Sequence, residues 1–136
     1  VQLIKLTGAV IVTTPQKVAL GDATKGLTMF RQPQINVPIL GVVENMAYFS
    51  PEELPENKYY LFGKEGGKRL AERFDVPLLG EIPIVQSIRE SGDTGFPAVL
   101  KSGITEKAFS ALAEAVARQV AIRNAEKNKT EVVQVN

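Results

Sequence analysis

The side chains that most often carry out chemistry in proteins are missing here, because the sequence contains no cysteine and no histidine. Without cysteine there is no disulfide, no thiolate nucleophile and no thiolate ligand for zinc or for an iron–sulfur cluster. Without histidine there is neither a Ser-His-Asp triad nor a histidine general base. Any chemistry within the 136 residues therefore falls to carboxylates, lysines, tyrosines and backbone groups.

One glycine-rich stretch, residues 63–69, contains the residue types of a phosphate-binding loop. Such a loop wraps phosphates with backbone N–H groups and adds a lysine for the phosphates and a Ser or Thr for magnesium. Here the glycine spacing differs, the stretch follows an aromatic loop instead of a strand, and Arg69 occupies the hydroxyl position. We interpret residues 63–69 as the glycine-opened start of a helix that packs against its neighbours.

Three charged residues have structural interpretations. Glu44 ends an apolar run, and we expect its carboxylate to tie a strand end to a neighbouring element instead of acting as a base. Asp22 and Lys25 have the i,i+3 spacing of an ion pair on the solvent face of a helix. The sequence therefore assigns no catalytic residue and no metal-ligand set.

Residues 44–62 are the least regular stretch, and Pro51 and Pro55 exclude a long helix there. We expect an ordered loop that is longer than most connections in compact domains. Its aromatic residues include Tyr48, Phe49, Tyr59 and Tyr60. They have two interpretations: a surface on which a partner docks, or anchors that hold the loop onto its domain.

Composition and charge are those of an ordinary soluble globular domain. Hydrophobic residues make up 44% and charged residues 23%, and 16 Lys and Arg against 15 Asp and Glu give a net charge of +1. This balance provides no basic surface for nucleic acid and no polybasic membrane anchor. The apolar runs are too short to span a bilayer, and the first residues lack a signal-peptide pattern. We expect a cytoplasmic protein that binds neither nucleic acid nor membrane.

The apolar pattern predicts three short strands, at residues 9–12, 39–43 and 78–82. Continuous apolar runs of this length are typical of strands that are covered on both faces in a parallel sheet. Pro83 is expected to close the third strand.

Helical periodicity and turn residues predict four helices, at residues 15–31, from 63 onward, at 85–90 and over 104–120. Thr14 followed by Pro15 is typical of an N-cap and a first helical residue. Residues 124–136 are polar and are expected to form a flexible tail.

The resulting order, β-α-β-loop-α-β-α-α, predicts an α/β fold in three layers with a partial, doubly wound, mainly parallel sheet. Residues 1–123 would form one domain and residues 124–136 the tail. A sheet of only three short strands has an exposed edge that pairs readily with another chain. We therefore expect either a piece of a larger sheet or a dimer that completes it.

Five motifs in series resemble the Mrp-type (ApbC-type) ATPases and cover roughly residues 1–120. They are residues 7–16 (TGAVIVTTPQ), residues 37–46 (VPILGVVENM), Phe62-Gly63 with Gly66-Gly67, residues 79–83 (LGEIP), and residues 88–90 (IRE) with Asp93. That family is grouped with MinD and the nitrogenase iron protein among dimeric P-loop ATPases, and its members are known as iron–sulfur cluster carriers or assembly factors. The resemblance implies ATP and magnesium as cofactors of the full-length protein, a homodimer, and iron–sulfur client proteins.

Two features of that family are missing. The sequence has no P-loop, so the family's phosphate and magnesium sites have no counterpart in it. The cysteine pair that usually follows the Glu-Asn-Met motif, and ligates a cluster shared across a dimer, is absent from residues 47–57. The carboxylates found there are hard ligands and do not replace thiolates. This branch therefore either holds its cargo differently or no longer carries a cluster in this way.

The resemblance transfers three cofactor-binding residues, Asn45, Pro83 and Ile84. Asn45 matches a family asparagine at a strand end, whose amide offers a donor and an acceptor to the adenine edge. Pro83 and Ile84 would supply backbone and apolar contact to the base beyond the carboxyl ends of the strands. The alternatives are a strand-end cap for Asn45 and a strand terminator for Pro83. Val85 occupies a position where the family usually has an aspartate, so nothing is transferred beyond Ile84.

The leading hypothesis is the adenine-side and dimer-forming part of an iron–sulfur carrier ATPase, inactive in ATP hydrolysis by itself. An alternative from another class is a non-enzymatic module that grips a protein partner with residues 44–62. A MinD-like spatial regulator is a third, but the last helix and the tail lack the basic amphipathic face that membrane targeting needs.

Overall fold

The computed structural model describes residues 4–126. The elements, in chain order, are β1 (Ala9–Thr13), α1 (Lys17–Phe30), β2 (Ile39–Phe49), α2 (Gly66–Arg73), β3 (Leu78–Ile84), α3 (Gln86–Thr94), the 3-10 helix η1 (Ala98–Leu100) and α4 (Ile104–Glu126). All three predicted strands and all four predicted helices are present, and η1 is an addition. The predicted α/β class is confirmed.

The three strands form one parallel sheet in the order β1-β2-β3. In the first pair, Ile11 lies opposite Val42. The second pair depends on a glycine, because a Cβ at Gly41 would lie 2.5 Å from Leu79 Cγ and 2.6 Å from the Pro77 carbonyl oxygen. Gly41 thus lets the start of β3 lie directly against β2.

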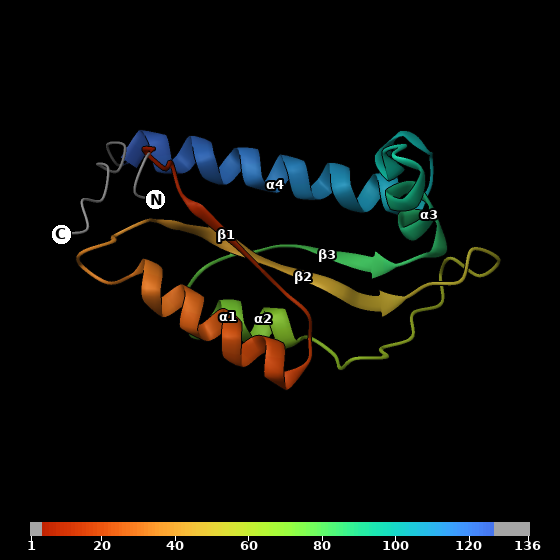
Figure 1. The fold of residues 1–136 in the computed structure, drawn as a ribbon, viewed down its shortest axis with the longest axis horizontal. Coiled ribbons are helices and arrows are strands. Elements are labelled where there is room, and N and C mark those ends of the chain that lie inside the picture. The colour runs from red at the N-terminus through yellow and green to blue at the C-terminus, as the bar shows by residue number, and fades with distance from the viewer. Residues whose placement is uncertain (1–3, 127–136) are drawn as a thin grey trace.

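Helices cover both faces of this sheet, which gives the predicted three layers (Figure 1). Helix α4 lies on one face, and α1 and α2 lie side by side on the other. The core on the α1–α2 face is built from Ile11, Leu27, Val42, Leu70 and Ala71. The core on the α4 face is built from Val43, Leu79 and Ile82, against which Ala108, Phe109, Leu112, Ala115 and Val116 pack. Val42 and Val43 serve different cores because successive strand residues point to opposite faces.

Helix α1 begins at Lys17, so the prediction of Thr14 as N-cap and Pro15 as first helical residue is wrong. The N-cap is Gln16, which has an extended backbone (φ −67°, ψ 140°) and makes no capping hydrogen bond with its side chain. Pro15 is buried against α2, since a Cβ at Gly66 would lie 2.8 Å from the Pro15 Cα. Pro15 is thus packed against α2 before the helix begins at Lys17.

Strand β2 extends through Phe49 and includes residues 44–49, which were predicted to be loop. Its pairing with β3 shifts between Asn45 and Phe49, and Met46 has a positive φ of 54°. Phe49 also pairs in antiparallel fashion with Tyr59. The strand is longer than predicted because the returning loop adds backbone hydrogen bonds at its end.

Pro83 does not close β3, which runs through it to Ile84, so the prediction of a strand terminator is wrong. Among the described strands β3 pairs only with β2, so it is an edge strand. Proline has no backbone N–H, and an edge strand tolerates it at a position that faces away from the neighbouring strand. The next helix, α3, was predicted over residues 85–90 and instead runs from Gln86 to Thr94, past Gly92. It ends before Gly95, whose φ of 72° suits a helix-ending glycine.

Helix α4 includes residues 124–126, which were assigned to the tail. The remainder of the predicted tail, residues 127–136, lies outside the described residues. No helix within residues 4–126 is both long enough and apolar enough to cross a membrane.

Candidate functional site

Asn45 and Pro83 lie on the neighbouring strands β2 and β3, Asn45 four residues before the end of β2 and Pro83 one residue before the end of β3. Asn45 pairs in register with Ile82, so Pro83 is the next residue along the adjacent strand. Asn45 is half-buried and Pro83 is buried. In the part of the chain that the structure describes, the Asn45 side-chain amide makes no hydrogen bond, so a capping bond to its own strand end is not formed. An amide with unused donor and acceptor groups therefore lies on β2, beside Pro83 of β3.

Ile84, the third predicted contact, is half-buried at the last position of β3. Its carbonyl oxygen accepts a hydrogen bond of 3.4 Å from the backbone N–H of Ser50, the residue that follows β2. Val85 comes next and is the buried N-cap of α3. This bond fixes the ends of the two strands relative to each other.

A cavity of about 390 Å³ opens beside these strand ends. Its walls include Ser50, Val85 and Thr105 of α4, and its size lies in the range of small-molecule sites. None of the three predicted base contacts lines this cavity. They lie on the strands themselves, whereas the cavity lies among the segments that follow the strands.

Glu44, which precedes the first of these contacts, is only 1% exposed. Its Oε2 accepts a hydrogen bond from the backbone N–H of Gly67 at the start of α2, and its Oε1 has no partner among the described residues. Burial raises the pKa of the Glu44 carboxyl, and the charges of Glu81 and Glu65 add to this effect. The hydrogen bond and the charge of Arg69 oppose it. The predicted tie to a neighbouring element is confirmed, but Glu44 lies within β2, whereas it was predicted at a strand end.

The glycine-rich stretch is the start of a helix, as predicted. Helix α2 begins at Gly66, and its N-cap Glu65 has a left-handed φ of 57°. Gly66 and Gly67 are both buried. A Cβ at Gly67 would lie 2.8 Å from Glu44 Cβ. The two glycines therefore allow α2 to pack closely on Pro15 and on Glu44 of β2, and their backbone is buried.

Aromatic contacts hold the loop that follows β2 against the domain. The ring centroids of Tyr48 and Tyr60 are 6.3 Å apart with the edge of one ring toward the other, and those of Phe49 and Tyr59 are also 6.3 Å apart. Tyr48 is buried, but Tyr59 and Tyr60 remain 47% and 41% exposed, and Leu61 is 61% exposed. The inner rings thus act as anchors, while the outer side chains leave an apolar surface.

Metal-binding side chains do not gather at this edge. Residues 4–126 contain no group of three or more Asp, Glu, His or Cys side chains placed to hold a metal ion. The whole sequence offers no thiolate. The residues present therefore do not fit an iron–sulfur cluster.

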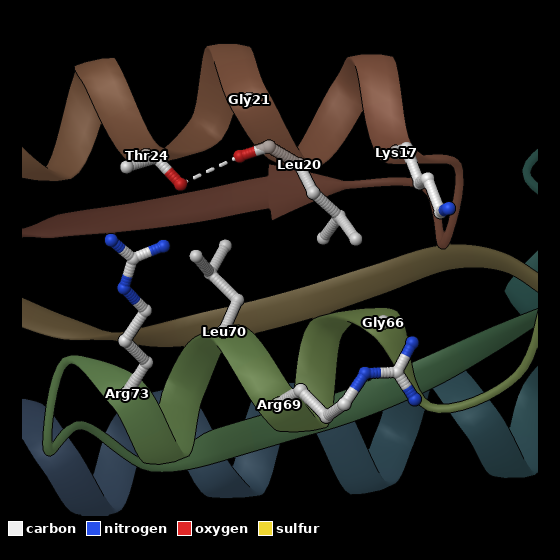
Figure 2. A pocket seen from close by; sticks show the side chains of 8 residues that line it. All are labelled: Lys17, Leu20, Gly21, Thr24, Gly66, Arg69, Leu70 and Arg73. Atoms are coloured by element: carbon white, nitrogen blue, oxygen red, sulfur yellow. Dashed lines mark hydrogen bonds between the residues drawn. The ribbon is translucent and has the colours of Figure 1, made fainter.

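A groove of about 340 Å³ between α1 and α2 was not predicted (Figure 2). Its lining residues are Lys17, Leu20, Gly21 and Thr24 on α1, and Gly66, Arg69, Leu70 and Arg73 on α2. Each set has the i, i+3, i+4, i+7 spacing of a single helix face. The signal was present in each helix, but only the fold places the two faces opposite each other.

Comparison with known proteins identifies the family. The model described as "ParA: NUBPL iron-transfer P-loop NTPase" matches residues 1–121. The chain is 46% identical over 123 residues to the iron-sulfur cluster carrier protein of Synechocystis sp., covering 89% of this chain and 34% of that protein. It is 48% identical over 119 residues to the mitochondrial iron-sulfur protein required for NADH dehydrogenase of Arabidopsis thaliana, covering 86% and 37%. The chain thus spans roughly a third of these relatives.

Solved structures share the fold. The septum site-determining protein MinD of Pyrococcus horikoshii, complexed with Mg-ADP, gives a TM-score of 0.62 at 28% identity over 86% of this chain and 44% of that one. A nucleotide-binding protein of Archaeoglobus fulgidus in complex with ADP gives 0.60 at 34% identity over 71% and 38%. The predicted resemblance to Mrp-type ATPases is confirmed. Because the family model spans nearly all of the described sheet and helices, this chain belongs to the ParA family of P-loop NTPases that includes the NUBPL iron-transfer proteins.

Proposed function

We propose that this chain forms the adenine-binding side of an ATP-dependent iron–sulfur cluster carrier and does not hydrolyse ATP by itself. The position of Asn45 carries the proposal. Its half-buried amide makes no hydrogen bond within the described residues and lies beside Pro83 in the carboxyl-terminal half of β2, in an open parallel sheet. Ligands of open α/β sheets bind beyond the carboxyl ends of the strands.

In this proposal the Asn45 amide pairs with the amino group and ring nitrogen of adenine, since it offers both a donor and an acceptor. Pro83 and Ile84 supply backbone and apolar contact to the base. The phosphates carry most of the charge of a nucleotide, and the 136 residues contain no P-loop to bind them. Phosphate and magnesium binding would belong to other residues of a longer protein.

The cluster is cargo in this proposal and not a resident cofactor. Since the chain has no cysteine, either the thiolate ligands come from outside this sequence or the cargo is held by other means. The name of the Synechocystis relative, an iron-sulfur cluster carrier protein, supports the cargo assignment. A homodimer, iron–sulfur client proteins and a cytoplasmic location complete the proposal.

Calorimetric titration of the chain with ATP and magnesium tests the first part. We expect no binding tighter than about the millimolar range, about −4 kcal/mol, because base contacts alone are weak. A micromolar dissociation constant or measurable hydrolysis would show that a phosphate site exists in this chain after all.

Recognition of the base is tested by nuclear magnetic resonance with adenosine monophosphate, and with ribose 5-phosphate as the ligand that lacks the base. We expect only adenosine monophosphate to shift the side-chain amide of Asn45, and Asn45→Ala to abolish the response of neighbouring backbone amides. Equal shifts with both ligands would exclude a role of Asn45 in base recognition.

The exposed side chains of residues 59–62 favour a second candidate, a protein-interaction module. A pull-down would compare the intact chain with a variant in which serine replaces both Leu61 and Phe62, two of these exposed side chains. Loss of partner capture in this variant, together with no response to adenosine monophosphate in the intact chain, would favour the module over the nucleotide site.

A further inference from the structure

The groove between α1 and α2 carries three cationic side chains and no carboxylate in its lining. Lys17 projects from α1, and Arg69 and Arg73 project from α2 (Figure 2). None of the three forms an ion pair with any residue from 4 to 126. Asp22 in α1 and Glu65 at the start of α2 are already paired with other lysines, at 3.3 and 3.7 Å. The lining of the groove is therefore positively charged, and the charge of Arg69 also acts on the buried Glu44 carboxyl.

The two arginines retain most of their hydrogen-bonding capacity. Arg69 donates through Nη1 to the carbonyl oxygen of Lys64 at 2.8 Å. The guanidinium of Arg73 lies 5.7 Å from the centroid of the Phe74 ring. A guanidinium has five N–H donors, so these contacts leave several for a bidentate bond to a carboxylate.

The charges lie at the two ends of the groove, around an apolar floor. Figure 2 shows Arg73 at one end, and Lys17 and Arg69 toward the other. Leu20 and Leu70 point toward each other between these ends. Leu70 is buried and Leu20 is half-buried, so they form a floor. The groove thus has one cation at one end, a pair of leucines in the middle and two cations toward the other end.

We propose that this groove binds an acidic segment of a partner protein, with carboxylates at the two ends and an apolar side chain over the leucine pair. A single phosphate ion is bound best by donors that converge on one point, whereas these cations are separated by the floor. Gly21 favours a peptide, because a Cβ at this position would meet no atom within 4 Å. A peptide backbone therefore has room to approach α1 closely.

The test is fluorescence anisotropy of the chain with a labelled short peptide that carries two glutamates on each side of a central leucine. We expect saturable binding that weakens as salt is added, because the groove is open to solvent. A peptide with lysines in place of the glutamates should not bind. Inorganic phosphate should compete no better than chloride at the same ionic strength, and stronger competition would show a small-anion site instead.

Charge-reversal variants locate the peptide. Lys17→Glu and Arg73→Glu should each weaken binding by about tenfold, since each replaces an attraction with a repulsion. Lys107→Glu is the matched control, because Lys107 is exposed on α4, on the opposite face of the sheet. If Lys107→Glu weakens binding as much, the peptide responds only to overall charge and the proposal is wrong.

Gly21→Leu tests the groove without changing any charge. The added side chain has open space at its Cβ, and leucine is a better helix former than glycine, so we expect a melting temperature no lower than that of the unmodified chain. We expect peptide binding to be lost because leucine fills the groove. Unchanged binding to a folded Gly21→Leu chain would overturn the proposal.

Discussion

Glu44 shows how one buried side chain couples the strand that bears the candidate site to a helix. Removing a carboxylate from water disfavours its ionised form, and only one of the two Glu44 oxygens regains a hydrogen bond, from Gly67. The next residue in the chain is Asn45, the predicted adenine contact. The pKa of the Glu44 carboxyl is raised because burial outweighs the favourable hydrogen bond from Gly67.

We expect the free energy of unfolding to fall as the pH rises from 4.5, the ordinary glutamate pKa, to the raised pKa of Glu44. Within that window the native state holds the proton more tightly than the unfolded state, so a higher pH favours unfolding. Above the window the contribution is constant. Glu44→Gln keeps an acceptor for the Gly67 N–H but has no titratable proton, and it should remove this decline. Urea denaturation over a pH series measures the effect.

Glu44→Ala is the control for the hydrogen bond. It leaves the N–H of Gly67 without its acceptor and should lower the free energy of unfolding by about 1–3 kcal/mol. If the Gln variant showed the same decline with pH as the unmodified chain, another group would be responsible for it.

Two helical glycines have opposite roles in the elements that contain them. Gly67 lies where α2 meets β2, and a Cβ there would stand 2.8 Å from Glu44 Cβ and 2.9 Å from its Oε2. A Cβ at Gly92 in α3 would meet no atom within 4 Å. The first glycine is therefore required by packing, and the second only weakens its helix.

Gly67→Ala should accordingly lower the free energy of unfolding by about 1–3 kcal/mol, because it forces α2 away from β2. Gly92→Ala should raise it by about 0.5–1 kcal/mol, because alanine is the better helix former. Chemical denaturation of both variants in one buffer gives the comparison. A similar change in both, in size and sign, would show that α2 adjusts without strain.

The existence, type and order of the elements could be predicted from the sequence, whereas several of their ends could not. Apolar periodicity is local, so it located the starts of β1 and α4 correctly. The start of α1 is set by Pro15 against Gly66, and the end of β2 by the pairing of Phe49 with Tyr59. Such contacts join segments that are far apart in the sequence, and no local pattern contains them.

The same reasoning applies to the candidate site. That Asn45 and Pro83 lie together follows from two parallel strands ending at one edge, which the sequence predicts. The cavity beside them also needs Thr105 at the start of α4, and the basic groove needs α1 and α2 side by side. The cavity and the groove depend on tertiary packing. The proximity of Asn45 and Pro83 was therefore predictable from the sequence, whereas the cavity and the groove were not.

The sheet as a whole is open at both edges, since β1 and β3 each pair only with β2 among the described strands. On β1, Val10 packs into the core beneath α4, but Val12, two residues later on the same face, is 61% exposed. Parallel sheets are usually covered on both faces. An uncovered apolar position on an unpaired edge is therefore where we expect another polypeptide to bind.

We expect the chain to self-associate through this edge as its concentration rises, in keeping with the proposed homodimer. Val12→Lys should keep it monomeric, because a charge on an edge strand opposes pairing with a second strand. Val18→Lys is the control. Val18 is 82% exposed on α1, so this substitution adds the same charge away from the edge strand. Sedimentation velocity over a concentration series distinguishes the outcomes. Equal loss of association in both variants would indicate general surface hydrophobicity, and a monomer at every concentration in the unmodified chain would show that the β1 edge does not pair unaided.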